Sequence, residues 1–441
     1  MAVFRKLCAR LDVVAFAGAV LFATFGYGVV VGKMNVFPHQ FLNVAFDAAK
    51  DWRDNWRHYL GIRSKWLQPT DRTEAVVSYD PDAAWNGYTF VTAYRDGYFG
   101  AHLIDMEGAI LHSWRPPLEA IWADLNDGEP LVPEIEIAVH GAALLPEGEV
   151  LLVLAGGAMA KLDRCSSYLW GIANEVHHSV DLTESGDIVT LGAAKRTPAE
   201  KRFPRVDAAV TGTYVDETVM RVRPDGTMID EFSALQVIYD SGDAALVIAA
   251  NGSAFRSSVE DITHLNDAEE LRSDMAGAFP QFEAGDLLLS FRNLNTIVVI
   301  DGTSHRIKWS MTGPFVGAHD PDFMPNGHIL LYDNRITGGS PQLGYTRILE
   351  IDPVTRAIVW QYQGTDAEPM YASFGGKVQL LPNGNVLTLE PEAGRVIEIA
   401  REDDNRLVWD YVNLAEEGWA GEIFDAIRVA PESVTFLGEG C

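Results

Sequence analysis

The chain has little positive charge. Its 441 residues include 34 lysines and arginines against 62 aspartates and glutamates, which gives a formal net charge of −28. A surface that binds nucleic acid needs clustered Lys and Arg to neutralise phosphates. The composition therefore excludes nucleic acid as a partner on any broad surface. An anionic ligand would need a locally positive pocket that works against the charge of the whole molecule.

Cysteine is scarce as well, and nucleotide-binding loops are missing. The three cysteines, Cys8, Cys165 and Cys441, lie far apart and match no CxxC or zinc-finger spacing, so a cysteine metal site is not expected. Cys8 falls in the N-terminal segment, and the sequence leaves open whether the other two pair. No glycine-rich loop has the spacing that cradles nucleotide phosphates, and we expect no cofactor.

Only one long apolar run is present. Residues Val13 to Gly32 form twenty residues without a charge, long enough to cross a bilayer as a helix. Three basic residues precede the run, and Lys33 alone follows it directly. The positive-inside rule then predicts a single-pass protein of a bacterial inner membrane, with its N-terminus in the cytoplasm and the rest in the periplasm. A cleaved signal peptide is the competing interpretation, but its apolar region would be shorter and end in an A-x-A-like site.

The next segment, residues 35–70, is predicted to be an amphipathic helical linker. Apolar residues recur at three- and four-residue steps from Phe41 to Leu60, with charged residues between them. A spacer that packs on the globular body is the preferred interpretation. The aromatic side chains would also suit the membrane surface or a partner membrane protein. The expected domains are thus an anchor (1–34), this linker (35–70) and one large body (71–441).

Residues 71–441 show the pattern of an all-β protein. Short β-branched and aromatic runs alternate with turns rich in Gly, Pro, Asn and Asp. One repeated half-unit is HGAALLPEGEVLLVL, which recurs as HSVDLTESGDIVTLG, HDPDFMPNGHILLYD and GKVQLLPNGNVLTLE. The other half ends in a tryptophan, at Trp114, Trp170, Trp309, Trp360 and Trp409, with a weaker copy that ends at Phe232. Six such units predict a six-bladed β-propeller, with a β-sandwich as the alternative. We expect the strand EIFDAIRVA to close the ring against the first unit near residues 75–79.

The repeats also place histidines in equivalent positions. In three units a histidine lies eight residues before the turn glycine: His140 before Gly148, His178 before Gly186, and His319 before Gly327. In the last unit Gly376 takes that place, and His264 starts a longer unit. Equivalent positions of a propeller lie on a ring at one end of its channel. We therefore expect His140, His178, His264 and His319 to converge.

The most specific motifs resemble a known family. The stretch GDLLLSFRNLNTIVVID, followed by GAHDPDFMPNGHILLYDN, is similar to the PAPS-independent bacterial arylsulfotransferases, as are HHSVDLTESGDI and DITHLND. The resemblance covers roughly residues 85 to 412. It implies a six-bladed propeller that transfers a sulfuryl group from an aryl sulfate to a phenolic acceptor through a sulfated histidine. Carried over by motif, His319 is the nucleophile, and His178, His264 and Arg292 bind and polarise the sulfate.

These residue types suit that chemistry without the family name. Neutral imidazole is a competent nucleophile near pH 7, and Arg offers a fixed fork of donors to a tetrahedral oxyanion. A second histidine can protonate the leaving phenolate and later deprotonate the acceptor. His140 and His177 are expected to contribute to substrate binding, although His177 should point away if His178 points in, and the reverse assignment stays open. His102, His112, His305 and His328 are interpreted as surface residues, and Asp320, Asp333 and Asn334 as turn or strand-end hydrogen-bonding residues.

Two other functions remain open. Secreted members of the family have a separate N-terminal β-domain and a disulfide near the site, whereas this chain has an anchor and a helix instead. A propeller without activity could therefore serve as a structural or binding subunit of a membrane protein complex. The third hypothesis, a histidine-lined metal site for hydrolysis, is disfavoured because no Asp/Glu pair stands at ligand spacing from the histidines.

Overall fold

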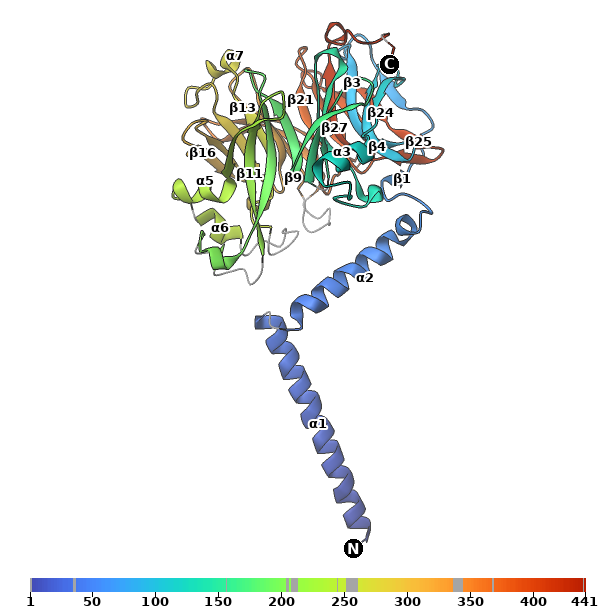
Figure 1. The fold of residues 1–441 in the computed structure, drawn as a ribbon, viewed down its shortest axis with the longest axis vertical. Helices are drawn as coiled ribbons and strands as arrows, with labels where there is room; N and C mark the ends of the chain where they lie inside the picture. Colours follow the sequence, from blue (N-terminus) through green and yellow to red (C-terminus); the bar gives the residue numbers. More distant parts are fainter. Residues whose placement is uncertain are drawn as a thin grey trace. The chain divides into compact units, whose positions relative to one another are not determined.

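The computed structural model describes residues 2–34, 37–155, 157–203, 206–207, 213–243, 245–250, 261–335, 344–366, 369–438 and 440–441. Within it the chain forms two compact units, Met1–Lys65 and Trp66–Cys441. Figure 1 shows both, with the helical unit in blue. Each unit is described by itself.

The first unit consists of two helices, α1 (Ala2–Met34) and α2 (His39–Tyr59). The stretch Val13–Gly32 of α1 has a mean hydropathy of 2.1, and it is long and apolar enough to cross a membrane. Most of its large side chains are exposed, with Phe16 at 73% and Leu21 at 71%, whereas Val31 near its end is buried. An apolar helix that buries so little of its surface in protein is typical of a membrane span or a signal sequence.

The second unit is built almost entirely from antiparallel strands. One four-stranded sheet has the order β27-β3-β4-β5, with bounds Ile423–Val429, Tyr88–Arg95, Tyr98–Ile104 and Ile110–Trp114. Two further sheets follow the chain order: β13 to β16 (Leu265–Glu270, Leu287–Phe291, Thr296–Ile300, Ile307–Thr312) and β17 to β20 (His319–Phe323, Ile329–Asp333, Arg347–Asp352, Ala357–Gln363). A five-stranded sheet contains β21 to β24 and β2 (Val378–Leu380, Val386–Glu390, Arg395–Ala400, Arg406–Val412, Val76–Tyr79). A small three-stranded sheet has the order β1-β26-β25 (Leu67–Pro69, Trp419–Gly421, Leu414–Glu416).

A seven-stranded sheet joins two repeats through one long strand. It runs β12-β11-β10-β9-β8-β7-β6, with β6 to β12 at Val139–Leu144, Val150–Leu154, Gly157–Leu162, Tyr168–Leu182, Ile188–Arg196, Tyr214–Val222 and Met228–Ser233. The first part of β9 pairs with β8 and the last part, from His177, with β10. Glu175 and His178 have positive φ angles of 51° and 58°, so the strand changes direction between its two partners. β9 is thus the last strand of one repeat and the first of the next.

Short helices fill the connections between these strands. They are α3 (Leu118–Leu125), α5 (Ala234–Asp240), α6 (Ala245–Ala250) and α7 (Ser273–Ala276), with 3₁₀ turns at Glu134–Glu136, Pro146–Gly148, Pro198–Glu200, Arg292–Leu294 and Pro431–Ser433. The helix α7 lies in the longer unit that follows His264. The chain therefore remains a series of hairpins with small insertions.

Each repeat buries its faces against its two neighbours. Hydrophobic clusters lie between β3–β5 and β6–β8, between β6–β8 and β9–β11, between β10–β11 and β13–β15, between β14–β16 and β17–β19, and between β18–β19 and β21–β23. A further cluster packs β22–β24 against β3 and β27, which are strands of the first sheet. A four-stranded sheet exposes two apolar faces, and stacking of neighbours is what removes them from water.

The tryptophans that end the repeats bond to the next repeat. Each indole N–H donates to an oxygen in a neighbouring turn: Trp114 to Gly148 O (2.8 Å), Trp170 to Pro224 O (3.1 Å), Trp309 to Pro353 O (2.9 Å), Trp360 to Asn405 Oδ1 (2.9 Å) and Trp409 to Met106 O (2.8 Å). The last of these bonds connects the final repeat to the first. A recurring sequence feature thus has a recurring structural role.

The strand pairing at the two ends of the second unit differs from the expected pairing. The strand β27, which contains EIFDAIRVA residues, pairs with β3 of the first sheet. Residues 76–79, where we expected it to pair, form β2 and pair instead with β24 of the last sheet. The chain therefore crosses over at its ends: β2, near the start of the second unit, completes the last sheet, and β27, near its end, completes the first sheet. Charge and hydropathy along the chain do not distinguish the two pairings.

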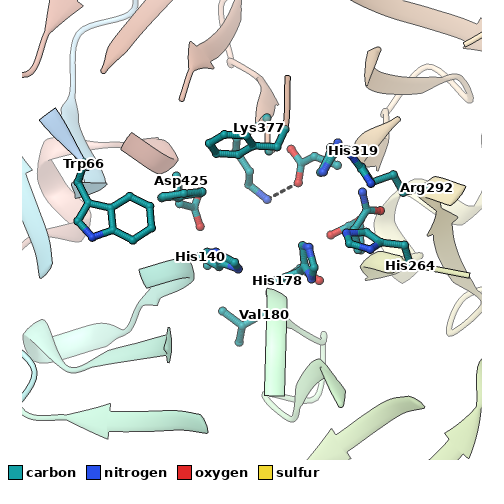
Figure 2. Close-up of a pocket in the computed structure, with 18 residues that line it drawn as sticks. Trp66, His140, His178, Val180, His264, Arg292, His319, Lys377 and Asp425 are labelled. Atoms are coloured by element: carbon teal, nitrogen blue, oxygen red, sulfur yellow. Dashed lines mark hydrogen bonds and ion pairs between the residues drawn. The ribbon is translucent and has the colours of Figure 1, made fainter. Parts of the chain in front are cut away.

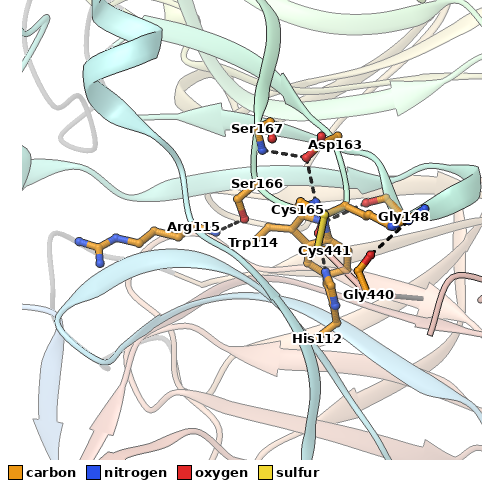
Figure 3. Close-up of a disulfide and its surroundings, with 11 residues drawn as sticks. His112, Trp114, Arg115, Gly148, Asp163, Cys165, Ser166, Ser167, Gly440 and Cys441 are labelled. Carbon is orange, nitrogen blue, oxygen red and sulfur yellow. Dashed lines mark hydrogen bonds between the residues drawn. A yellow bond between two sulfur atoms is a disulfide. The ribbon is translucent and has the colours of Figure 1, made fainter. Parts of the chain in front are cut away.

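Cys165 and Cys441 form a disulfide, a pairing that the sequence left open. Figure 3 shows that it ties the C-terminus to the turn between β8 and β9. In the same turn Asp163 Oδ1 accepts hydrogen bonds from the backbone N–H groups of Cys165 and Ser167, each at 2.8 Å. A cross-link between residues 276 positions apart removes many conformations from the unfolded chain.

The tryptophan bonds predict a graded loss of stability. Trp409 is fully buried, so Trp409→Phe leaves the Met106 carbonyl without its donor in a dry environment, and we expect the free energy of unfolding to fall by roughly 1–3 kcal/mol. Trp170→Phe, at a half-exposed bond, should cost less than about 0.5 kcal/mol. Chemical denaturation of both variants measures this. Equal losses of unfolding free energy in the two variants would contradict the idea that burial strengthens the bond between the last repeat and the first.

Candidate functional site

One cavity lies where several edge strands meet. Its volume is roughly 430 Å³, and its lining comes from segments far apart in the sequence: Trp66, His140, Gly141, His178, Ser179, Val180, His264, Asn266, Asp267, Arg292, His319, Asp320, Phe374, Gly375, Gly376, Lys377, Phe424 and Asp425. The segments are those of β6, β9, β13, β17, β21 and β27, together with the Arg292 turn. Figure 2 shows Trp66 at one end of the group and Arg292 and His264 at the other. The four histidines expected to converge all line this cavity.

Irregular backbone at the strand starts turns these side chains inward. The pairing shifts register beside His140 in β6, in β9 at His178, at the start of β13, after His319 in β17, and beside Asp425 in β27. His178 and His264 have φ angles of 58° and 46°, which side chains rarely adopt. β-bulges re-aim side chains and are frequent beside functional sites. The same distortion in several repeats indicates that the positions serve a common purpose.

The proton on His319 is fixed by its partners. Its Nδ1 lies 2.7 Å from Asn334 Oδ1 and 3.0 Å from the Gly317 carbonyl oxygen, both acceptors, so Nδ1 carries the hydrogen. Asn334 is held in this orientation because its Nδ2 donates to Gly375 O at 2.8 Å. Burial and the nearby Arg292 guanidinium lower the pKa of His319 to about 3. His319 is therefore a neutral imidazole at pH 7, with an unprotonated Nε2.

A chain of hydrogen bonds orients His178 in the same way. His177 Nε2 donates to the Gly192 carbonyl oxygen at 3.2 Å, which leaves His177 Nδ1 as an acceptor. The Nδ1 atoms of the two histidines are 2.7 Å apart, so His178 donates there. Burial lowers the pKa of His177 to about 4 and that of His178 well below its usual range. His177 does not line the cavity and acts on it only through His178.

His264 differs from the other histidines because a carboxylate faces it. Its Nδ1 donates to Asp261 Oδ2 at 2.5 Å, which fixes the orientation of the imidazole ring. Burial and Asp261 together raise the pKa of Glu217 to about 8. The rings of His178 and His264 lie 5.1 Å apart, centroid to centroid.

Two cations line the cavity, Arg292 and Lys377. Lys377 Nζ lies 2.5 Å from Asp320 Oδ1, and Asp320 follows His319 directly in the sequence. Burial opposes the charge on Lys377, but Asp320, Asp425 and other carboxylates outweigh it and raise its pKa well above the usual range. Burial, with a smaller contribution from Asp320, raises the pKa of Asp425 to about 6 against the influence of Lys377. The cavity therefore brings Arg292 and the Lys377–Asp320 ion pair together with His140, His178 and His319, whose pKa values are lowered.

The other end of the cavity is aromatic. Phe374 and Phe424 stack with centroids 5.7 Å apart, and Trp66 meets Phe424 edge-on at 6.0 Å. The His140 ring lies 4.8 Å from Phe424 and 5.4 Å from His178, so it connects the aromatic end to the histidines. Burial lowers the pKa of His140 to about 4. A ligand with an aromatic ring and an anionic head matches both ends.

The other histidines lie outside the cavity lining, but one expectation for them is wrong. His102, interpreted as a surface residue, is 2% exposed, and its Nδ1 lies 2.9 Å from Ser113 Oγ. It sits on β4 between two strands, where alternate side chains face the interior. His305 stacks on Phe232, and His328 bonds Glu350 at 2.5 Å.

Three residues of the site were not identified from the sequence. Lys377 takes the place of a histidine in its repeat, because Gly376 has a φ of 132° and a Cβ there would lie 2.3 Å from the Tyr332 ring. Asn334, expected to be a strand-end residue, positions His319. Asp261 precedes His264 by three residues in DITH, and this short spacing is a signal that could have been used.

One group among the described residues could hold a metal ion. Ligand atoms of Glu217, Asp261 and His264 lie within 4.8 Å of one another. The reason for disfavouring a metal was therefore wrong in part, since His264 does have two carboxylates nearby. One oxygen of each carboxylate already has a donor, however: Asp261 Oδ2 accepts from His264, and Glu217 Oε2 accepts from Leu265 N at 2.6 Å.

The fold and cavity together define an all-β protein in which histidines from several repeats, an arginine and a lysine line one cavity. The model of the arylsulfotransferase (ASST) family matches residues 141–414, which is more than half of the chain. The chain belongs to this family, as the sequence motifs predicted. A comparison with curated proteins finds no match.

Several solved structures are similar to the chain at low identity. A protein of unknown function from Bacteroides caccae has 13% identity and a TM-score of 0.47, and the match covers 77% of this chain and 98% of that one. The WD40 β-propeller domain of Doa1 has 12% identity and a TM-score of 0.41, with 82% and 93% covered. A streptogramin B lyase has 12% identity and a TM-score of 0.40, with 78% and 86% covered. Likenesses at this level say nothing about activity.

The hydrogen bonds of His319 predict its tautomer. In the ¹⁵N spectrum of histidine-labelled protein, we expect the resonances missing from His319→Gln to show a protonated Nδ1 and an unprotonated Nε2 that do not titrate between pH 8 and 5, because the pKa is about 3. His319→Gln assigns the signals, and His328→Gln is the control for a histidine outside the cavity. A titration midpoint for His319 near the ordinary value of about 6.5 would contradict a neutral imidazole at this position.

Proposed function

We propose that the protein is a membrane-anchored, periplasmic arylsulfotransferase that moves a sulfuryl group from an aryl sulfate to a phenolic acceptor through a sulfohistidine at His319. The observation that carries the proposal is the fixed Nδ1–H of His319, which leaves a neutral Nε2 beside Arg292 in a cavity with an aromatic end. Family membership supports the same reaction. No cofactor takes part, because the donor already carries the group to be transferred.

The body is proposed to be a six-bladed propeller with this cavity at one end of its channel. Six strand groups that pack in sequence, with the last against the first, support this architecture. The α1 helix is the proposed anchor, and the basic residues before it favour a cytoplasmic N-terminus. The Cys165–Cys441 disulfide supports an oxidising compartment such as the periplasm.

In the first half-reaction His319 Nε2 attacks the sulfur, and the bond from sulfur to the aryl oxygen breaks. The leaving aryl oxide takes a proton from Nε2 of His264, whose ring is held in place by the hydrogen bond from its Nδ1 to Asp261. Arg292 and His178 contact the non-bridging sulfate oxygens, where charge is greatest. Lys377 provides the second positive charge and stabilises the oxide as it forms.

The second half-reaction reverses these roles with a new phenol. The acceptor gives its proton to His264 as its oxygen attacks the sulfur, and the bond between nitrogen and sulfur breaks. His319 returns to the neutral state. The aromatic end of the cavity, with Phe374 and Phe424, would hold the ring of each substrate in turn.

A transfer assay tests the proposal on the purified full-length chain. With 4-nitrophenyl sulfate as donor and phenol as acceptor, we expect nitrophenol release by the wild type and none above background by His319→Gln. Lys377→Met should lower kcat by roughly 10²–10³-fold, as removal of one oxyanion stabiliser does, and Lys377→Arg should restore part of it. His328→Gln, outside the cavity, should leave the rate unchanged.

Two outcomes of this assay would overturn the proposal. If His319→Gln releases nitrophenol as fast as the wild type, His319 is not the nucleophile. If a folded wild-type protein releases none, the enzyme proposal fails, and the binding-subunit alternative remains. Metal analysis of the same sample tests the hydrolytic alternative at Glu217, Asp261 and His264.

A further inference from the structure

The helix α2 presents an apolar surface that the described residues leave uncovered. At about 100° per residue, its large apolar side chains fall on one side. Phe41 is 69% exposed, Leu42 54%, Phe46 71%, Trp52 53% and Trp56 40%. A helix of a globular body would bury this stripe, because each such side chain is stabilised by removal from water. Lys50 and Arg57 lie at one edge of this stripe, about 40° and about 20° beyond Phe46 around the helix axis.

The short connection from α1 limits what can cover this surface. α1 ends at Met34 and α2 begins at His39. The four intervening residues span at most roughly 14 Å when fully extended, and the headgroup layer on one side of a bilayer is roughly 5–8 Å deep. If α1 crosses a membrane, the first turn of α2 therefore starts within or beside that layer.

The composition of α2 suits this location. Aromatic residues are enriched at membrane–water interfaces, and helices with a broad apolar face lie there in the plane of the membrane. Lys50, Arg53 and Arg57 lie on one flank of the apolar side, where they can reach lipid phosphates. The Arg57 guanidinium also sits 5.4 Å above the Trp56 ring, which places it at the border of the two surfaces.

The acidic residue Asp51 does not oppose this arrangement. Its carboxylate accepts hydrogen bonds within the helix, from Asn55 Nδ2 at 2.7 Å and from Tyr59 Oη at 2.5 Å. Tyr59 in turn stacks on Trp52, with centroids 5.8 Å apart. The carboxylate of Asp51 and the hydroxyl of Tyr59 are thus paired inside α2, and the rings of Trp52 and Trp56 are exposed.

We propose that α2 lies in the headgroup layer of the membrane that α1 spans, with Phe41, Phe46, Trp52 and Trp56 directed to the lipid. The occupant of the apolar face is a lipid surface rather than the β-rich body or a partner protein. The proposal is independent of the reaction in the cavity and requires only that α1 is inserted.

Nitroxide labels on the full-length chain test it. The chain is placed in nanodiscs of phosphatidylcholine and phosphatidylglycerol, with Cys8→Ser so that position 8 takes up no label, and with one label at Phe46→Cys, Phe41→Cys or Lys50→Cys. Collision rates are measured with oxygen, which concentrates in lipid, and with a water-soluble nickel chelate. We expect the labels at 41 and 46 to favour oxygen and the label at 50 to favour nickel.

A fourth label separates failure of the anchor from failure of the inference. Phe22→Cys, in the middle of the span, should be reached by oxygen and not by nickel if α1 is inserted. With that result in hand, nickel access at both 46 and 50 would mean that α2 lies in water. A label at 46 that neither reagent reaches would mean that α2 packs against protein. Either result overturns the proposal.

Discussion

Burial of uncharged imidazoles around a fixed arginine is the interaction on which this site depends. A histidine in water is partly protonated near neutral pH, and a protonated ring has no lone pair with which to attack. In the cavity, burial and Arg292 hold the pKa of His319 far below that value, and Asn334 fixes which nitrogen carries the proton. The result is an imidazole whose Nε2 lone pair is available without a base, as the proposed nucleophile requires. In the proposed reaction the positive charge for the anion comes from Arg292 and Lys377.

The repeat architecture makes this concentration of buried polar groups possible. The polar side chains come from several different strands and from the turn at Arg292, and hydrophobic clusters pack the neighbouring sheets against one another. The tryptophan bonds between repeats resist the separation of those sheets. A single hairpin could not bury four histidines and two cations, because the desolvation of each group must be offset by hydrogen bonds from elsewhere.

Much of this was predictable from the sequence, for identifiable reasons. The spacing from histidine to turn glycine predicted that the histidines converge, because equivalent positions of the repeats meet in space. Gly148, Gly186 and Gly327 do adopt the positive φ angles of such turns. Lys377 was missed because steric exclusion at Gly376 shifts the inward position by one residue. The β2 and β27 pairings and the burial of His102 were also missed, since they depend on which strand is adjacent in space. The roles of His319, His178, His264 and Arg292 stay predictions from the motif.

The covalent intermediate is the most direct test of the account. Full-length protein is mixed with aryl sulfate without acceptor, quenched in base because a sulfated imidazole is labile in acid, and digested for peptide mass spectrometry. The account predicts one added sulfuryl group on the peptide that contains His319, absent from His319→Gln and lost when a phenol is added before the quench. A sulfuryl group on another residue, or turnover without any modified peptide, would contradict it.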